Sequence, residues 1–114
     1  MTMDQTNLAN QVRPLVERLH RDLDRLSYYQ LLSVGRTAST TAIQQAFYRR
    51  AVLLHPDRHF RLDDAELKAK INTVYKRISE AYRVLSTPPL RTLYDSRLLQ
   101  GQLRLQQKDD ESQS

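Results

Sequence analysis

Residues 41–60 read TAIQQAFYRRAVLLHPDRHF, and this stretch decides the fold. Its apolar residues recur at intervals of four, four and three, which is the spacing of one face of an α-helix: Ile43, Phe47, Ala51 and Leu54. Pro56 then fixes its own φ angle, lacks an N–H and pushes His55 out of the helical region. We therefore predict a helix over residues 41–54 that ends in a rigid turn over residues 55–57.

Residues 64–85 carry a second apolar seam with helical spacing: Leu67, Ile71, Val74, Ile78, Ala81 and Leu85. Two amphipathic helices joined by a short turn bury these seams against each other in an antiparallel arrangement. The segment between them, residues 57–61, is too polar to be buried without partners, so we expect its side chains to project into solvent. The predicted fold class is all-α: an antiparallel helical hairpin with short flanking helices and an N-terminal amphipathic helix.

A third seam precedes the hairpin: Leu8, Val12, Val16, Leu19, Leu23 and Leu26. Pro14 fits best in the first turn of a helix, which places the regular part of this helix over residues 13–26. Two interpretations are open. The helix is either an arm folded against the hairpin or a seam that takes up a coiled-coil or client helix.

Short elements are predicted on both sides of the hairpin. Residues 27–34 are apolar and aromatic, and we favour a short helix because no second strand-like segment exists to pair with them. Ser39 or Thr40 is expected to cap the helix that follows. Beyond the hairpin, Thr87 is expected to cap a last helix that begins with two prolines and runs to about Leu99. The inward face of this helix is predicted to be Leu90, Leu93, Tyr94 and Leu98.

The pattern divides the chain into an arm (residues 1–26), a helical domain (27–98) and a polar tail (99–114), in which residues 106–114 are predicted to be disordered. The 114 residues are 39% hydrophobic and 27% charged, with a formal net charge of +5 and no cysteine. Disulfides, zinc–thiolate sites and thiol catalysis are therefore excluded. No signal peptide or membrane span is apparent, so we expect a soluble, cytoplasmic protein with acidic partners.

The order of helix, His-Pro-Asp turn and helix resembles the J domain of the DnaJ cochaperone family. Two further stretches agree with it in order and spacing: YYQLL at residues 28–32, and EAYRVLS at residues 80–86 followed by RTLYD at residues 91–95. The resemblance covers residues 27–98. Because neither a glycine/phenylalanine-rich linker nor a cysteine-rich zinc module follows, the chain resembles the J-domain-only class.

The resemblance implies that the turn docks on a DnaK-type heat-shock ATPase in its ATP state and stimulates ATP hydrolysis and client capture. The chain is then an activator and not an enzyme, with no cofactor, no metal, and no binding to nucleic acid or membrane. Asp57 is the implied partner of an arginine on the ATPase. The implied partner-binding residues are His55, Pro56, Asp57, Tyr48, Arg49, Arg50 and Arg58.

The chain departs from the family on the open face of the helix over residues 41–54, where several lysines and arginines are usual. Gln44, Gln45, Tyr48 and Leu53 occupy that face, and only Arg49 and Arg50 remain. Fewer cations weaken electrostatic steering, so we expect a weak or selective stimulator. An alternative is an interaction adaptor that keeps the fold but does not stimulate the ATPase. Ser33 also stands where the family usually has glycine.

The charged residues allow three other interpretations. Arginines at positions 49, 50, 58, 61 and 77 could contact nucleic-acid phosphates, but acidic residues are interleaved with them. His55, Asp57 and His59 alternate like metal ligands, yet no fourth donor is evident, and we expect His59 to be a solvated loop residue. An acid–base pair of His55 and Asp57 would need a cleft that a helical hairpin does not offer.

Overall fold

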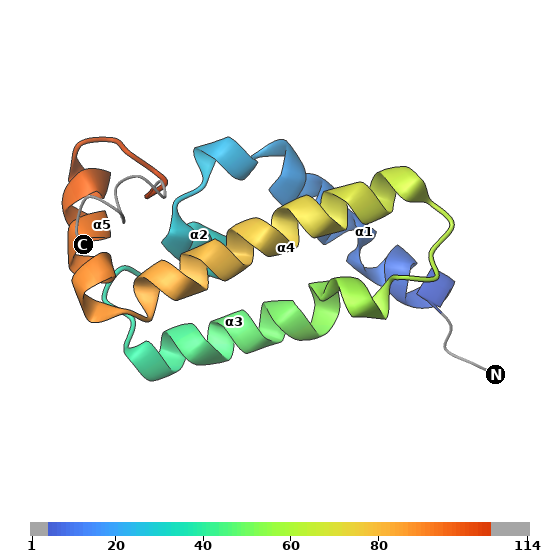
Figure 1. Ribbon diagram of the computed structural model, residues 1–114, viewed down its shortest axis with the longest axis horizontal. Helices are drawn as coiled ribbons and strands as arrows, with labels where there is room; N and C mark the ends of the chain where they lie inside the picture. The colour runs from blue at the N-terminus through green and yellow to red at the C-terminus, as the bar shows by residue number, and fades with distance from the viewer. Residues whose placement is uncertain (1–4, 106–114) are drawn as a thin grey trace.

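The computed structural model describes residues 5–105, and within that range the chain is helical without strands (Figure 1). The elements in chain order are α1 (Gln5–Arg21), the 3-10 turn η1 (Leu23–Arg25), α2 (Tyr28–Leu32), α3 (Thr40–Leu54), the 3-10 turn η2 (Pro56–Arg58), α4 (Ala65–Leu85) and α5 (Pro88–Leu99). The predicted all-α class is confirmed.

Helices α3 and α4 form the predicted antiparallel hairpin (Figure 1). Ser39 caps α3 by accepting a hydrogen bond from the Ala42 N–H at 3.0 Å, and Asp64 caps α4 by accepting from the Leu67 N–H at 3.0 Å. All six predicted seam residues of α4 are buried. On α3 the buried residues are Ile43, Ala46 and Leu54, while Phe47 stacks on Tyr82 with ring centroids 4.4 Å apart.

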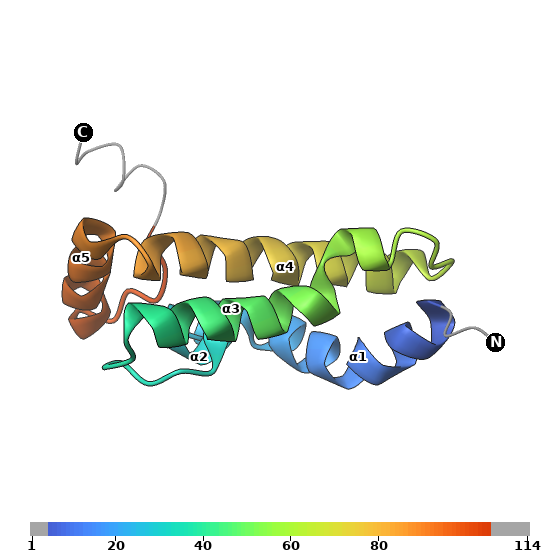
Figure 2. The ribbon, with the colours of Figure 1, turned by 90° about the horizontal axis from the view of Figure 1, so that it is seen from below.

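Helix α1 lies against α4, beside the hairpin (Figure 2). Its seam residues Val12, Val16 and Leu19 are buried in the common core. Two ion pairs reinforce the packing: Lys70 with Glu17 at 2.7 Å, and Arg13 with Asp64 at 3.3 Å. The helix is therefore a folded arm, the first of the two interpretations, and its seam is not free to form a coiled coil.

The predicted limits of the arm helix were wrong. Pro14 lies inside α1 and not in its first turn. An interior proline removes one backbone hydrogen bond. Here the burial of Ala9 and Val12, which extends the seam upstream of the proline, offsets that loss. The regular helix also ends at Arg21 and not at Leu26. The chain then forms the 3-10 turn η1, and Leu26 has an extended backbone before α2 begins.

Helix α2 is the predicted short helix, and its ends explain its position. The Ser27 hydroxyl accepts from the Gln30 N–H at 3.1 Å, while the Gln30 side chain accepts from the Ser27 N–H at 2.8 Å, which forms a capping box. At the other end Ser33 has φ of 60°. This left-handed conformation favours glycine, which accounts for the residue usual in the family.

The predicted capping role of Thr87 was wrong. Thr87 stands at the N-cap of α5, but its hydroxyl donates to the Arg83 carbonyl at 2.8 Å. Pro88 and Pro89 follow it and have no N–H to donate, so most of the usual reason for a capping acceptor is missing. Of the predicted inward face of α5, Tyr94 is fully buried and the three leucines are partly buried.

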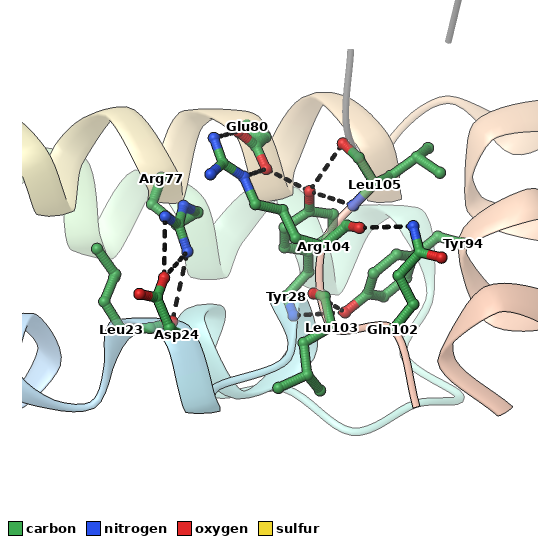
Figure 3. Close-up of polar contacts among 10 residues, drawn as sticks. All are labelled: Leu23, Asp24, Tyr28, Arg77, Glu80, Tyr94, Gln102, Leu103, Arg104 and Leu105. Carbon is green, nitrogen blue, oxygen red and sulfur yellow. Dashed lines mark hydrogen bonds and ion pairs between the residues drawn. The ribbon is translucent and has the colours of Figure 1, made fainter. Parts of the chain in front are cut away.

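The predicted tail begins with an ordered segment. Residues 102–105, which we call the C-terminal strap, return across α2 and α4 (Figure 3). Leu105 is 1% exposed, and Tyr94 donates a hydrogen bond to the Leu103 carbonyl at 2.8 Å. The boundary at residue 99 was therefore drawn too early, because it rested on local polarity while the strap is held by tertiary contacts. The predicted disorder of residues 106–114 lies outside the described residues.

Tyrosine and glutamate side chains anchor the strap (Figure 3). The rings of Tyr28 and Tyr94 stack with centroids 4.3 Å apart. The Tyr28 hydroxyl donates to Glu80 and accepts from the Leu105 N–H at 2.8 Å. Arg104 donates two hydrogen bonds of 2.7 Å to the Glu80 carboxylate. The strap thus closes one end of the hairpin with a satisfied polar network.

The anchoring groups have shifted pKa values. Burial acts to raise the pKa of Glu80, but hydrogen bonds from Arg104 and Tyr28 outweigh it and leave that pKa lowered. Burial, with the hydrogen bond to Glu80, raises the pKa of Tyr28. Burial also raises the pKa of Tyr94 to about 12.

In residues 5–105 no helix is long and apolar enough to span a membrane.

Candidate partner-binding site at the His-Pro-Asp turn

The His-Pro-Asp turn stands at the opposite end of the hairpin from the strap (Figure 1). The last helical hydrogen bond of α3 runs from the His55 N–H to the Ala51 carbonyl at 2.9 Å. Pro56 then opens η2, in which the Arg58 N–H donates to the His55 carbonyl at 2.9 Å. The proline therefore converts the helix end into a tight turn, as predicted.

The side chain of His55 is fixed by the backbone of Asp57. Its Nδ1 accepts a hydrogen bond from the Asp57 N–H at 3.1 Å, so the neutral ring carries its hydrogen on Nε2. The ring lies against Tyr75 of α4, with centroids 5.0 Å apart. The imidazole is thus held in one orientation and keeps an Nε2–H donor.

The carboxylate of Asp57 is an exposed anion on this fixed turn. Its side chain is 91% exposed. The nearest cationic candidate is His55 Nδ1, 3.8 Å from Oδ2, but that nitrogen already accepts a hydrogen bond and carries no proton in this arrangement. A carboxylate held this way suits a cationic group of another molecule.

The predicted contact residues of α3 do not share one environment. Arg49 and Tyr48 are exposed, and the Tyr48 hydroxyl accepts from the Gln44 amide at 3.3 Å. Arg50 turns toward α2 instead, where its Nε donates to the Leu31 carbonyl at 3.3 Å. Burial lowers the pKa of Arg50, and the like charges of Arg18 and Arg49 add to that effect. Beyond the turn, Arg58 is exposed.

The expectation for His59 was wrong. We predicted a solvated residue, but His59 is 1% exposed. Its Nε2 lies 2.9 Å from the Leu53 carbonyl. The ring borders a cavity of about 170 Å³ between the turn and α4, together with Phe60, Ile71 and Asn72. Only the capacity of histidine to donate to a carbonyl at a helix C-terminus hinted at this role.

Over the range that it describes, the structure does not assemble the residues that a metal site or a phosphate-binding face would need. His59 uses Nε2 on a backbone carbonyl while Asp57 points into solvent, and residues 5–105 contain no cluster of three potential metal ligands. Arg77 is mostly buried and pairs with Asp24 at 3.3 Å (Figure 3). Since Arg50 also turns inward, the five arginines considered for phosphate binding do not form one open face.

Comparison with known proteins adds family information. The model of the DnaJ domain family matches residues 27–95. The mouse (Mus musculus) protein named DnaJ homolog subfamily C member 11 is 40% identical over 74 residues, which is 65% of this chain and 13% of that protein. Human (Homo sapiens) DnaJ homolog subfamily C member 7 is 34% identical over 95 residues, 81% of this chain and 19% of that protein.

An archaeal relative, the chaperone protein DnaJ of Thermoplasma volcanium, is 44% identical over 68 residues, which is 60% of this chain and 17% of that protein. The chain therefore spans less than a fifth of the length of each of these relatives. No solved structure matches the chain significantly.

Proposed function

Because the chain belongs to the DnaJ domain family, we propose that it is a cochaperone that docks on a DnaK-type heat-shock ATPase through the His-Pro-Asp turn. In this proposal the chain is not an enzyme. It accelerates ATP hydrolysis by its partner and so promotes client capture.

The observation that carries the proposal is the presentation of Asp57. The residue follows a proline, its backbone N–H is held by the His55 ring at 3.1 Å, and its carboxylate is 91% exposed. Such a group loses little conformational entropy when it pairs with an arginine, because the backbone that carries it is already ordered. An exposed and fixed anion is the feature a recognition turn requires.

Stimulation then follows from linkage. A ligand that binds the hydrolysis-competent arrangement of the ATPase more tightly than the resting arrangement shifts the population toward hydrolysis. The chain needs no catalytic group of its own for this effect. The differential contact of Asp57 with the two arrangements sets the size of the effect.

The α3 surface favours a stimulator with modest electrostatic steering. Arg50 is committed to the Leu31 carbonyl, so Arg49 is the exposed arginine of that pair. Tyr48 next to it is 53% exposed and neutral. With few exposed cations on α3, association should depend only weakly on salt.

The test is a steady-state ATPase assay of a DnaK-type protein with increasing amounts of this chain. Asp57→Asn removes the charge with almost no change in shape, so stimulation should fall to the basal rate. Asp63→Asn, which alters an exposed aspartate a few residues further on, should leave stimulation unchanged. Full stimulation by Asp57→Asn would refute the proposal.

The inward position of Arg50 also favours a second candidate, an adaptor that binds the ATPase without stimulating it. The same assay separates the two when binding is measured in parallel by calorimetry. An adaptor saturates its partner while turnover stays at the basal rate. A cochaperone raises turnover with the same saturation curve.

A further inference from the structure

His59 makes three hydrogen bonds in and around the turn. Its N–H donates to the Pro56 carbonyl at 2.9 Å, and its carbonyl accepts from the Leu62 N–H at 3.1 Å. Its side chain reaches back to α3, where Nε2 meets the Leu53 carbonyl at 2.9 Å. The two backbone bonds shape the turn, and the imidazole connects it to the helix.

The chemistry of this contact fixes the tautomer of His59. A carbonyl oxygen can only accept, so the hydrogen of the neutral ring is on Nε2. Nδ1 is then a buried lone pair, and it has no hydrogen-bond partner in the described part of the chain. An apolar side chain would fill this space without an unpaired nitrogen. The particular contribution of histidine here is the directed Nε2–H bond.

His55 and His59 together replace one backbone hydrogen bond that a longer helix would have made. His55 supplies the acceptor and His59 supplies the donor. If α3 continued, the Asp57 N–H would donate to the Leu53 carbonyl. In the turn that N–H is taken by His55 Nδ1. The His59 Nε2–H replaces it on Leu53, so this carbonyl at the end of α3 keeps a donor although Pro56 ends the helix.

On one side the turn packs on α4, where the His55 ring lies against Tyr75 and the Lys68 ammonium donates to the Phe60 carbonyl at 3.0 Å. A cavity of about 170 Å³ lined by the turn, Ile71 and Asn72 leaves this packing incomplete. A loop with such a space beside it shifts more easily than a fully packed one. The side-chain bond from His59 to Leu53 ties the turn to α3 on the other side.

We propose that His59 is a positioning residue that fixes the His-Pro-Asp turn relative to α3, so that Asp57 and the exposed part of α3 form one preorganised surface. This inference rests on the proposed docking on a DnaK-type ATPase. Loss of the hydrogen bond from His59 to Leu53 should weaken docking, because the turn must then be ordered on binding. The maximal stimulation should stay unchanged.

Two variants separate the hydrogen bond from the packing. His59→Phe keeps an aromatic ring but has no donor. His59→Gln places an amide N–H at about the reach of Nε2 and can restore the bond. We expect the concentration of chain that gives half-maximal ATPase stimulation to rise about tenfold for His59→Phe and to stay within about twofold for His59→Gln.

Two NMR measurements on the chain alone complete the test. Long-range ¹H–¹⁵N spectra should show the His59 hydrogen on Nε2. Amide exchange at Asp57 and Leu62 should be faster in His59→Phe than in the natural chain and in His59→Gln. Thermal melting of each variant shows whether the fold is retained.

The proposal is overturned by any of three results: equal half-maximal concentrations for His59→Phe and the natural chain, equal impairment of both variants, or a hydrogen on Nδ1. If the natural chain stimulates no DnaK-type ATPase, the proposed function fails. The NMR measurements still decide on the tie, because unchanged amide protection in His59→Phe refutes it and lost protection supports it.

Discussion

The two ends of the α3–α4 hairpin are built from similar residue types but in opposite ways. At the strap end, the polar atoms of Tyr28, Tyr94 and Glu80 bind one another and the backbone of residues 102–105 (Figure 3). At the turn end, the Asp57 carboxylate is almost fully exposed. One end therefore uses its polar groups within the fold, and the other presents a carboxylate to solvent.

The difference between the two ends indicates that the strap end contributes more to stability and the turn end more to recognition. A buried and satisfied network favours one arrangement of the chain and tolerates little change. A charged turn with few core contacts contributes little to the free energy of unfolding, so it can be selected for binding. We expect variants at the two ends to separate these properties, and the following predictions go from the largest effect on stability to the smallest.

The largest effect is expected for Tyr28→Ala at the strap end. The ring is fully buried and stacked on Tyr94, so its removal should leave a cavity and lower the free energy of unfolding by about 3 to 5 kcal/mol. The control, Tyr48→Ala, removes the same side chain from an exposed position of α3 and should change that free energy by no more than about 0.5 kcal/mol. Urea unfolding followed by circular dichroism measures both. Equal losses would show that the buried network at the strap end contributes no more to stability than an exposed position of α3.

The hairpin itself could be predicted from the sequence because its causes are local. Helical spacing and the ring of Pro56 determine α3, η2 and α4 whatever surrounds them. The same local reasoning failed at Pro14, where packing of the residues upstream outweighs the preference of proline for a first turn.

The turn and the strap show where sequence reasoning stops. Exposure of Asp57 was foreseen from the polarity of the segment, and the structure agrees. Burial of His59 depends on a carbonyl six residues earlier, for which the chemistry of histidine gives only a weak hint, and on the shape of α4, which has no local sequence signal. Leu105 follows a polar stretch and is buried because Tyr28 and Glu80, far away in the chain, hold the strap.

A smaller effect is expected for Arg104→Gln, which breaks the paired hydrogen bonds to Glu80 but retains an amide. The carboxylate keeps its bond from Tyr28 and Arg104 is partly exposed, so the loss should be about 1 kcal/mol. Arg25→Gln on the exposed side of η1 is the matched charge control and should be neutral. A double-mutant cycle with Glu80→Gln measures the coupling, and a coupling of zero would show that the strap is not held by this pair.

The pH dependence of stability should follow the strap end. The lowered pKa of Glu80 means that its contribution is present above the unfolded-state value near 4.5 and is lost as the pH falls through the folded value. The lowered pKa values of Glu17 and Asp64 act in the same direction. The raised pKa values of Tyr28 and Tyr94 instead remove stability as the pH rises above about 10.

Urea midpoints measured across the pH range test this. Glu80→Gln should reduce the loss on the acid side and, because the Glu80 carboxylate helps to raise the pKa of Tyr28, should also reduce the loss on the alkaline side. An acid profile identical to that of the natural chain would assign the acid sensitivity to other carboxylates.

The smallest effect on stability is expected for His55→Gln at the turn end. The side chain is 45% exposed, and the Asp57 N–H that loses its acceptor is at the surface, where water can replace the imidazole. The free energy of unfolding should therefore change by no more than about 0.5 kcal/mol. Stimulation of a DnaK-type ATPase should nevertheless be lost, because the ring that orients the Asp57 backbone and presents an Nε2–H is gone. Thermal melting and ATPase assays on the same preparation test this prediction. A parallel fall in melting temperature and stimulation would mean that the turn stabilises the fold as the strap does. The contrast between the two ends would then disappear.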